Sequence, residues 1–251
     1  MMQPLTQDQT EYLPADLIAD VRARTGQLLT EDDTPVDNIF SEKQQRLLTE
    51  ALYSSWEGPL LENGARRAYV AFANVGLFRS LYLPPIVPDV FLSLDVKVQE
   101  PVYENHHRSY FLWEMGKAPE IVMEIVSNRE GNELGSKLHD YAQIPVVYYI
   151  IYDPMRRLGE QTLRMLELRD GQYLPRTSKY FPLIHLGLTL WEGEYEGTHA
   201  LWLRWTNEKG ELIPTGAERA AREAERAAHE AQRADRLADK LRELGIDPDQ
   251  V

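Results

Sequence analysis

The sequence contains no cysteine. Disulfide bonds, thiol catalysis and zinc or iron–sulfur sites built from cysteine are therefore excluded. No stretch approaches the ~18 consecutive apolar residues of a membrane-spanning helix. The polar N-terminus also lacks the basic and apolar regions of a secretory signal. We therefore expect a cytoplasmic protein that does not contact a membrane.

Positive charge is also scarce, because 27 lysines and arginines face 40 acidic residues, for a net charge of −13. Phosphate binding normally draws on a basic surface, so this balance argues against strong non-specific binding of nucleic acid. A local basic cleft stays open, since several cations are available to line one: Arg66, Arg67, Lys97, Lys117 and Arg129.

The 251 residues, 43% of them hydrophobic, suffice for one substantial domain with its own core and an appendage. Shifts in composition divide the chain into three parts. We expect an N-terminal extension over residues 1–35, a globular domain over residues 36–215 and an alanine-rich charged helix over residues 216–251.

Two carboxylates stand inside otherwise apolar segments. Asp89 follows Val-Pro and precedes Val-Phe-Leu, and Glu124 lies within Ile-Val-Met-Glu-Ile-Val. A short β-branched run of this kind is typical of a strand buried on both faces, where an unpaired charge is costly. The energetic cost of burying these two charges indicates that the acids have a functional role. A turn-forming role for Asp89 and an arginine partner for Glu124 stay open as simpler interpretations.

Carboxylate oxygens are preferred ligands of Mg²⁺ and Mn²⁺, and one or two of them, with water and a phosphate oxygen, make a usual Mg²⁺ shell. A divalent ion would make both ionised acids tolerable. Lys137 follows at the start of a predicted helix that continues to about Gln143. It would bring a positive charge to the same site, although an ordinary exposed helix lysine is the simpler interpretation.

At these residues the chain resembles the Uma family of restriction endonucleases, a branch of the PD-(D/E)XK nuclease superfamily. The resemblance extends from about residue 36 to residue 215. It is carried by four segments: Pro88-Asp89-Val90, the run from Pro119 to Ser127, Lys137 with Tyr141, and the run from Tyr148 to Pro154.

The resemblance implies that Asp89 and Glu124 hold the metal and that Lys137 is the catalytic lysine. One departure concerns the lysine, which the superfamily pattern places two residues after the glutamate, where this chain has Val126. The resemblance implies that the family supplies its lysine from the following helix, at Lys137.

Two further acids are accessory candidates. In nucleases of this superfamily the first core helix can add an acid near the metal, which makes Glu50 a candidate, with a solvated helix face as the plainer alternative. Glu133 precedes Lys137 by four residues. It would orient the lysine or the attacking water, or it is only a first-turn acid favoured by the helix dipole.

The pattern predicts an α/β fold, with a restriction-endonuclease-like mixed sheet flanked by helices. Helices are predicted at Asp16–Thr25 and, with Ser41 as N-cap, from Glu42 to about Trp56. The Lys137 helix between two apolar runs indicates a strand–helix–strand unit. The predicted strands are Ala68–Ala73, Val90–Val96, Ser109–Trp113, Ile121–Val126, Val146–Tyr152, Thr162–Arg169 and Leu201–Trp205.

After Gly216 the sequence becomes alanine with paired charges. Small residues recur at alternating steps of four and three, which is a heptad seam: Ala220, Ala224, Ala227, Ala231, Ala234, Ala238 and Leu241. This pattern predicts a helix that forms a coiled coil, and hence a homo-oligomer, or one that simply lies in solvent.

Other site classes fail in detail. The loop before Lys137 lacks the Gly-Lys pair of a phosphate-binding loop, no His-x-x-x-His pair occurs, and no Gly-x-Ser-x-Gly elbow is present. We therefore expect an endonuclease that hydrolyses DNA phosphodiester bonds with Mg²⁺ or Mn²⁺. The alternatives are a catalytically silent nuclease-like protein that assembles through its C-terminal helix, and a nuclease that acts on RNA.

Overall fold

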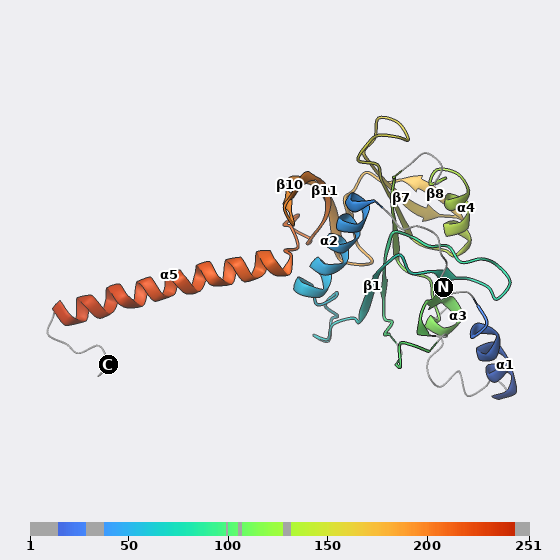
Figure 1. Cartoon of the computed structure of the whole chain (residues 1–251), viewed down its shortest axis with the longest axis horizontal. Coiled ribbons are helices and arrows are strands. Elements are labelled where there is room, and N and C mark those ends of the chain that lie inside the picture. Colours follow the sequence, from blue (N-terminus) through green and yellow to red (C-terminus); the bar gives the residue numbers. More distant parts are fainter. Residues whose placement is uncertain (1–14, 29–37, 99, 105–106, 128–131, 244–251) are drawn as a thin grey trace.

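A six-stranded mixed sheet forms the centre of the molecule, seen in a computed structural model (Figure 1) that describes residues 15–28, 38–98, 100–104, 107–127 and 132–243. Its strand order is β1-β3-β5-β6-β7-β8. The strands are β1 (Tyr69–Ala73), β3 (Val90–Leu94), β5 (Ile121–Ile125), β6 (Tyr148–Tyr152), β7 (Leu163–Arg169) and β8 (Gln172–Pro175). Only β5 and β6 run parallel, and all other neighbours in this sheet are antiparallel.

Two smaller sheets and five helices complete the described structure. A three-stranded sheet contains β9 (Tyr180–Phe181), β10 (Leu186–Tyr195) and β11 (Thr198–Thr206), and β2 (Leu77–Phe78) pairs with β4 (Tyr110–Phe111). The helices are α1 (Ala15–Thr25), α2 (Ile39–Ser55), α3 (Leu112–Met115), α4 (Ser136–Gln143) and α5 (Gly216–Glu243).

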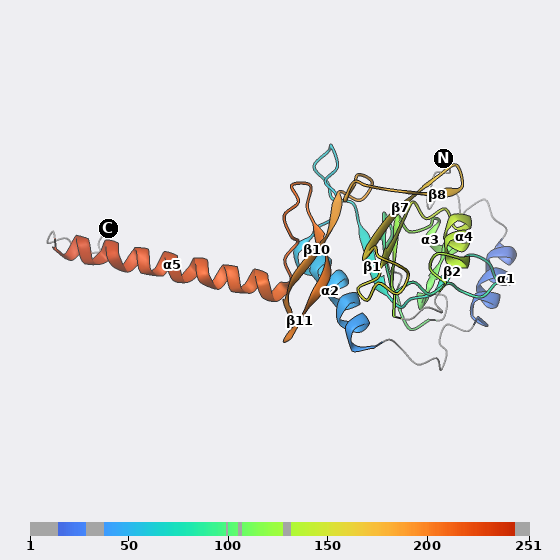
Figure 2. The same ribbon diagram turned by 90° about the horizontal axis from the view of Figure 1, so that it is seen from above.

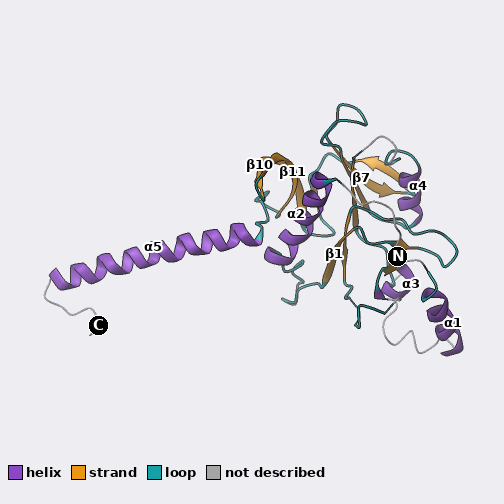
Figure 3. Ribbon diagram, viewed as in Figure 1, coloured by secondary structure: helices purple, strands orange, loops and turns teal. Residues whose placement is uncertain are grey.

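Each face of the central sheet carries its own apolar layer. Helix α2 and the β9–β11 sheet cover one face, where Leu48 and Leu52 pack with Leu92, Ile150 and Trp205. Helix α4 lies against the other face (Figure 3), and Tyr110 of strand β4 belongs to the same apolar layer. There, Tyr141 and Tyr110 pack with residues such as Val122 and Tyr149. The central strands are therefore buried on both sides, as their continuous apolar runs predict.

Strands β5 and β6 with α4 between them form the predicted strand–helix–strand unit, and the two strands pair in parallel. Most expected elements lie within two or three residues of their observed bounds. The predicted buried face of α2, at Leu47, Leu48, Ala51 and Leu52, is also confirmed.

Three expectations about local structure are wrong. The N-cap of α2 is Asn38, whose side chain accepts a hydrogen bond from the Ser41 backbone nitrogen at 3.0 Å, so the helix begins three residues earlier than Ser41 implies. The predicted strand Ser109–Trp113 is only two residues long, because the chain turns into α3 at Leu112. Strand β10 was not expected, although Leu186, Leu188 and Leu190 alternate as a strand requires.

Helix α5 projects away from the body in both views (Figures 1 and 2), and none of its residues is buried. Its first turn is anchored. Thr215 and Glu218 form a reciprocal capping box, because the Glu218 nitrogen bonds Thr215 Oγ1 at 3.1 Å and Glu218 Oε2 accepts from the Thr215 nitrogen at 2.8 Å. Glu218 also pairs with buried Arg204 at 2.6 Å. The helix therefore leaves the body in a set direction.

Among the helices of the described ranges, none is both long and apolar enough to cross a lipid bilayer.

Candidate functional site

Asp89 and Glu124 meet at one end of the central sheet. Strands β3 and β5 are antiparallel, with Val90 opposite Met123. One step further along this register, Asp89 lies opposite Glu124, and directly opposed side chains share a face of the sheet. That face is the one covered by α4, because Val122 and Phe91, two residues from each acid, belong to its apolar layer. Two like charges so placed repel each other and need a cation.

Glu124 is the better buried of the two acids, with an exposed fraction of 2%. Lys137 Nζ donates to its Oε2 at 2.9 Å, and the Tyr141 hydroxyl donates to its Oε1 at 2.5 Å. Lys137 and Tyr141 lie four residues apart on α4, so one helix face presents both donors. Burial raises the pKa of the Glu124 carboxyl, against the opposing effect of Lys137 and Tyr141.

The Lys137 ammonium remains charged at this site. Burial alone would lower the pKa of this group, but the attraction of Glu124, with further contributions from Glu133 and Asp89, outweighs burial and raises it. A lysine in this state acts as a fixed positive charge, and it is a poor general base.

Asp89 is held by the backbone and by α2. Its Oδ2 accepts from the Ile125 nitrogen at 2.5 Å, and its Oδ1 accepts from Gln45 Nε2 at 3.1 Å. Gln45 in turn accepts a 2.9 Å hydrogen bond from Asn74, which follows β1. Strand β5 and helix α2 therefore hold this carboxylate directly, and Asn74 orients the Gln45 side chain that contacts it.

Glu133 lies just before α4, with its Oε1 3.9 Å from Lys137 Nζ. Its exposed fraction is 5%, and its Oε2 is buried without a hydrogen-bond partner. The Tyr149 hydroxyl donates to the Glu133 carbonyl oxygen at 3.0 Å and holds the backbone here. Glu133 thus adds a third carboxylate beside the lysine.

Glu50, the other accessory candidate, is engaged elsewhere. Its Oε1 accepts from Ser54 Oγ at 2.5 Å and from the Gly216 nitrogen at 2.8 Å, at the start of α5. The α2 side chain that contacts Asp89 is Gln45 instead. No sequence signal distinguishes Gln45 from other polar residues of an amphipathic helix, whereas Tyr141 had one, its four-residue spacing from Lys137.

Comparison with protein families gives one match. A family model described as "Uma2: Putative restriction endonuclease" matches residues 16–189, from α1 into β10. The chain belongs to this family. No curated protein matches the chain. Its mixed sheet flanked by helices is the restriction-endonuclease-like fold, and the matched range contains Asp89, Glu124 and Lys137.

Proteins of the restriction-endonuclease-like class generally use divalent metals, so the fit of such an ion to this Uma2 chain can be tested on its donors. Within the described ranges, no three His, Asp or Glu side chains are grouped to hold a metal. Asp89 and Glu124 still offer hard carboxylate oxygens on one face, which suits an ion that keeps water and substrate oxygens in its shell. The unpartnered Glu133 Oε2 adds negative potential nearby. The residues therefore fit Mg²⁺ or Mn²⁺ held by two carboxylates.

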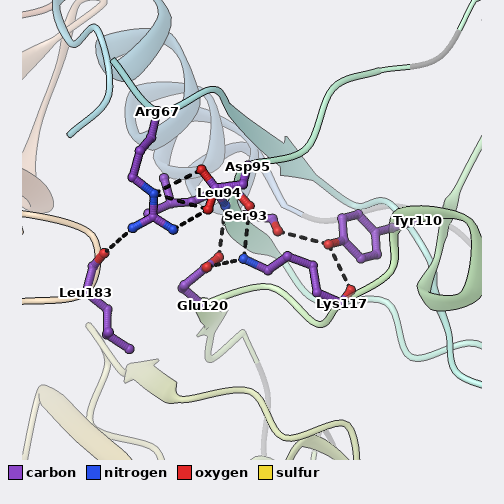
Figure 4. Close-up of polar contacts among 8 residues, drawn as sticks. All are labelled: Arg67, Ser93, Leu94, Asp95, Tyr110, Lys117, Glu120 and Leu183. Carbon is purple, nitrogen blue, oxygen red and sulfur yellow. Dashed lines mark hydrogen bonds and ion pairs between the residues drawn. The ribbon is translucent and has the colours of Figure 1, made fainter. Parts of the chain in front are cut away.

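The opposite end of strands β3 and β5 carries a second polar cluster, shown in Figure 4. Glu120 pairs with Lys117, and its Oε2 accepts from the Leu94 nitrogen at 2.9 Å. Arg67 pairs with Asp95, donating through Nε to Oδ1 at 3.0 Å. These contacts join the ends of β3 and β5 to the start of β1.

The expected basic cleft lies at this second end of the strands. Arg66, Arg67 and Lys97 line a surface pocket beside Asp95, and Lys117 pairs with Glu120. Asp89 and Asp95 are separated by the length of β3, roughly 20 Å at 3.3 Å per residue. Four of the five cations are thus not beside Glu124, which corrects that expectation, and Arg129 lies outside the described residues.

Proposed function

We propose that this Uma2 protein is an endonuclease that hydrolyses DNA phosphodiester bonds with Mg²⁺ or Mn²⁺. The observation that carries the proposal is the opposed pair Asp89 and Glu124, joined by the ammonium of Lys137 at 2.9 Å from Glu124. A buried carboxylate such as Glu124, placed opposite a second acid, is costly as a purely structural device. It suits a site that receives a second cation.

In this proposal Asp89 and Glu124 hold the ion, and Lys137 supplies a fixed positive charge. A divalent cation bound there would lower the pKa of its water and polarise the scissile phosphate. The Lys137 ammonium would stabilise negative charge that develops on the attacking water or the phosphate oxygens. Tyr141 would hold Glu124 Oε1, and Gln45 would hold Asp89 Oδ1, so that neither carboxylate rotates away.

DNA is the substrate that the family description favours. The net charge of −13 and the distance between the basic pocket and Glu124 predict weak, strongly salt-dependent binding. Cleavage should therefore be assayed at low ionic strength. An RNA substrate tested in parallel would distinguish a deoxyribonuclease from the alternative of a ribonuclease.

The experiment is nicking of supercoiled plasmid with Mn²⁺ at low salt, comparing the wild type with Asp89→Asn and Lys137→Ala and using a chelator as control. We expect nicking by the wild type alone, at least about 100-fold above either variant. Unchanged nicking in both variants would exclude this site. A folded wild type that cleaves neither DNA nor RNA would exclude the proposed activity.

A second candidate function is assembly through α5, which is supported by the absence of any buried residue along this helix. Truncation after Arg222 would remove most of the alanine seam while keeping the Glu218–Arg204 pair and the Glu50 contact that anchor its first turn. If α5 forms a homo-oligomer, sedimentation should change from oligomer to monomer. A full-length monomer would exclude this role.

A further inference from the structure

Glu133 carries a buried carboxylate oxygen that the rest of the site leaves unused. Its Oε2 has no hydrogen-bond partner, and the side chain is almost completely enclosed. An unsatisfied buried acceptor destabilises the folded state, and more so when the group is charged. Such a cost is tolerated where another state of the site uses the group.

The neighbour of Glu133 that can change partners is Lys137. Its ammonium lies 2.9 Å from Glu124 Oε2 and 3.9 Å from Glu133 Oε1, so a shift of its end exchanges one carboxylate for the other. The lysine stem is flexible and its ammonium is a compact charge with three donors. By contrast, the Glu133 backbone is held in place, because the Tyr149 hydroxyl donates to its carbonyl oxygen.

The Lys137 ammonium, 2.9 Å from Glu124 Oε2, lies where a divalent ion on Glu124 would compete with it. Two cations on one carboxylate repel each other, at a cost that rises in a buried site. A divalent ion that binds Asp89 and Glu124 would therefore displace the ammonium toward Glu133, whose Oε1 is 3.9 Å away and whose Oε2 has no hydrogen-bond partner among the described residues.

We propose that Glu133 is a positioning residue that receives the Lys137 ammonium when a divalent cation binds Asp89 and Glu124. The inference rests on the proposed function, because it requires that metal site. In this proposal Lys137 is the counter-ion of Glu124 before a metal binds and stays beside the site after the metal binds. Glu133 acts through Lys137 and is not itself a metal ligand.

The competition between the ammonium and the metal predicts the direction in which Mn²⁺ affinity changes. Because the ammonium competes with the metal for Glu124, Lys137→Met should tighten Mn²⁺ binding several-fold although it abolishes cleavage. Methionine keeps most of the buried stem without its charge. Glu133→Gln should weaken Mn²⁺ binding about tenfold in the wild-type background, since the displaced ammonium loses its acceptor.

The test is a double-mutant cycle on direct Mn²⁺ binding, measured by electron paramagnetic resonance on the full-length protein without substrate. Its members are the wild type, Glu133→Gln, Lys137→Met and the double variant, each checked for folding by circular dichroism. Loss of the Glu133 charge weakens binding through space in both backgrounds. Only the contact between Glu133 and Lys137 makes this loss of Mn²⁺ affinity larger when Lys137 is present. We expect the loss caused by Glu133→Gln to be at least threefold greater in the wild-type background than in the Lys137→Met background.

The outcomes separate this inference from the proposed function. Equal effects of Glu133→Gln in both backgrounds, or no tightening by Lys137→Met, would overturn the inference alone. Absence of Mn²⁺ binding by the folded wild type, or unchanged binding by Asp89→Asn, would overturn the metal site and the inference together. Glu120→Gln, at the far end of the same strands, is the matched control and should bind Mn²⁺ as the wild type does.

Discussion

Strands β3 and β5 present two acidic clusters built from the same residue types, one at each end. At one end Asp95 and Glu120 are paired with Arg67 and Lys117. At the other end Lys137 pairs with Glu124, which lies opposite Asp89, and the buried Glu133 Oε2 has no hydrogen-bond partner among the described residues. Counted over the described residues alone, the first cluster pairs two acids with two cations, whereas the second brings three carboxylates near one lysine.

The difference distinguishes a cluster that closes the end of the sheet from the cluster proposed to bind the metal. Glu120 also accepts from the Leu94 backbone, and the Lys117 ammonium donates to the Leu94 carbonyl at 2.9 Å, so this cluster closes the end of the sheet (Figure 4). Among the described residues, the excess of carboxylates over cations at the Glu124 end does not stabilise the sheet in this way. Buried groups with incomplete partners and shifted pKa values gather at functional sites.

The largest expected contrast is in activity. Glu124→Gln should reduce plasmid nicking by at least about 100-fold, because a carboxamide is a poor ligand for a hard cation. Glu120→Gln should leave nicking within about threefold of the wild type, since it lies at the far end of the strands. Initial rates at equal concentrations of folded protein provide the measurement. Equal losses in the two variants would mean that both ends serve catalysis.

The free energy of unfolding should show the reverse order, with the larger loss in Glu120→Gln. Glu120→Gln places an amide against the Lys117 ammonium and should lower the free energy of unfolding by about 2 kcal/mol. Glu124→Gln relieves repulsion from Asp89 and Glu133 and should change it by less than about 1 kcal/mol. Urea unfolding followed by tryptophan fluorescence measures both. A larger loss for Glu124→Gln would indicate a structural role for that acid.

Two fully buried tyrosines allow a finer comparison. Tyr141 donates to Glu124 Oε1, and Tyr110 bridges Ser93 Oγ at 2.9 Å and the Lys117 carbonyl at 3.0 Å. Each Tyr→Phe change removes one hydroxyl and keeps the ring. We expect Tyr141→Phe to reduce nicking about tenfold, as for a lost orienting contact, while Tyr110→Phe lowers only the melting temperature. The idea fails if Tyr141→Phe cleaves normally.

The smallest expected effect is on the pH dependence of stability. The hydrogen bond from Arg67 lowers the pKa of Asp95 below its ordinary value of 3.8. A depressed carboxyl pKa contributes stability above the unfolded value, and this is lost as the pH falls through the folded value. Between about pH 5 and 3, the melting temperature of Asp95→Asn should therefore fall less than that of the wild type. The difference should be up to about 3 °C, because the pair is half-exposed. An equal fall in melting temperature with pH in the two proteins would contradict this prediction.

The sequence predicts the acids at the functional end better than the cluster at the other end. Glu124 interrupts a β-branched run, so its position in a buried strand and its cost can be read directly. Glu120 and Lys117 are a common pair three residues apart on a short turn. Their importance depends on the Leu94 backbone, which only the folded strands bring near.

Residues that reach the site from other elements could not be predicted for the same reason. Whether Gln45 or Glu50 meets Asp89 depends on how α2 is set across the sheet, and its amphipathic pattern specifies only the buried side. The helix start was misplaced because Asn38 and Ser41 are both good capping residues. By contrast, β10 carried a readable alternation in Leu186, Leu188 and Leu190.

The register of β3 against β5 has a consequence for how this chain can vary in length. Asp89 and Glu124 share a face only while Val90 stays opposite Met123, and a slip of one residue would turn one acid to the other face. Extra length in an exposed connection elsewhere in a chain costs little. A single inserted residue within Val90–Leu92 would separate the acids without removing either of them. Length changes within these paired strands are therefore disabling, even where both acids are retained.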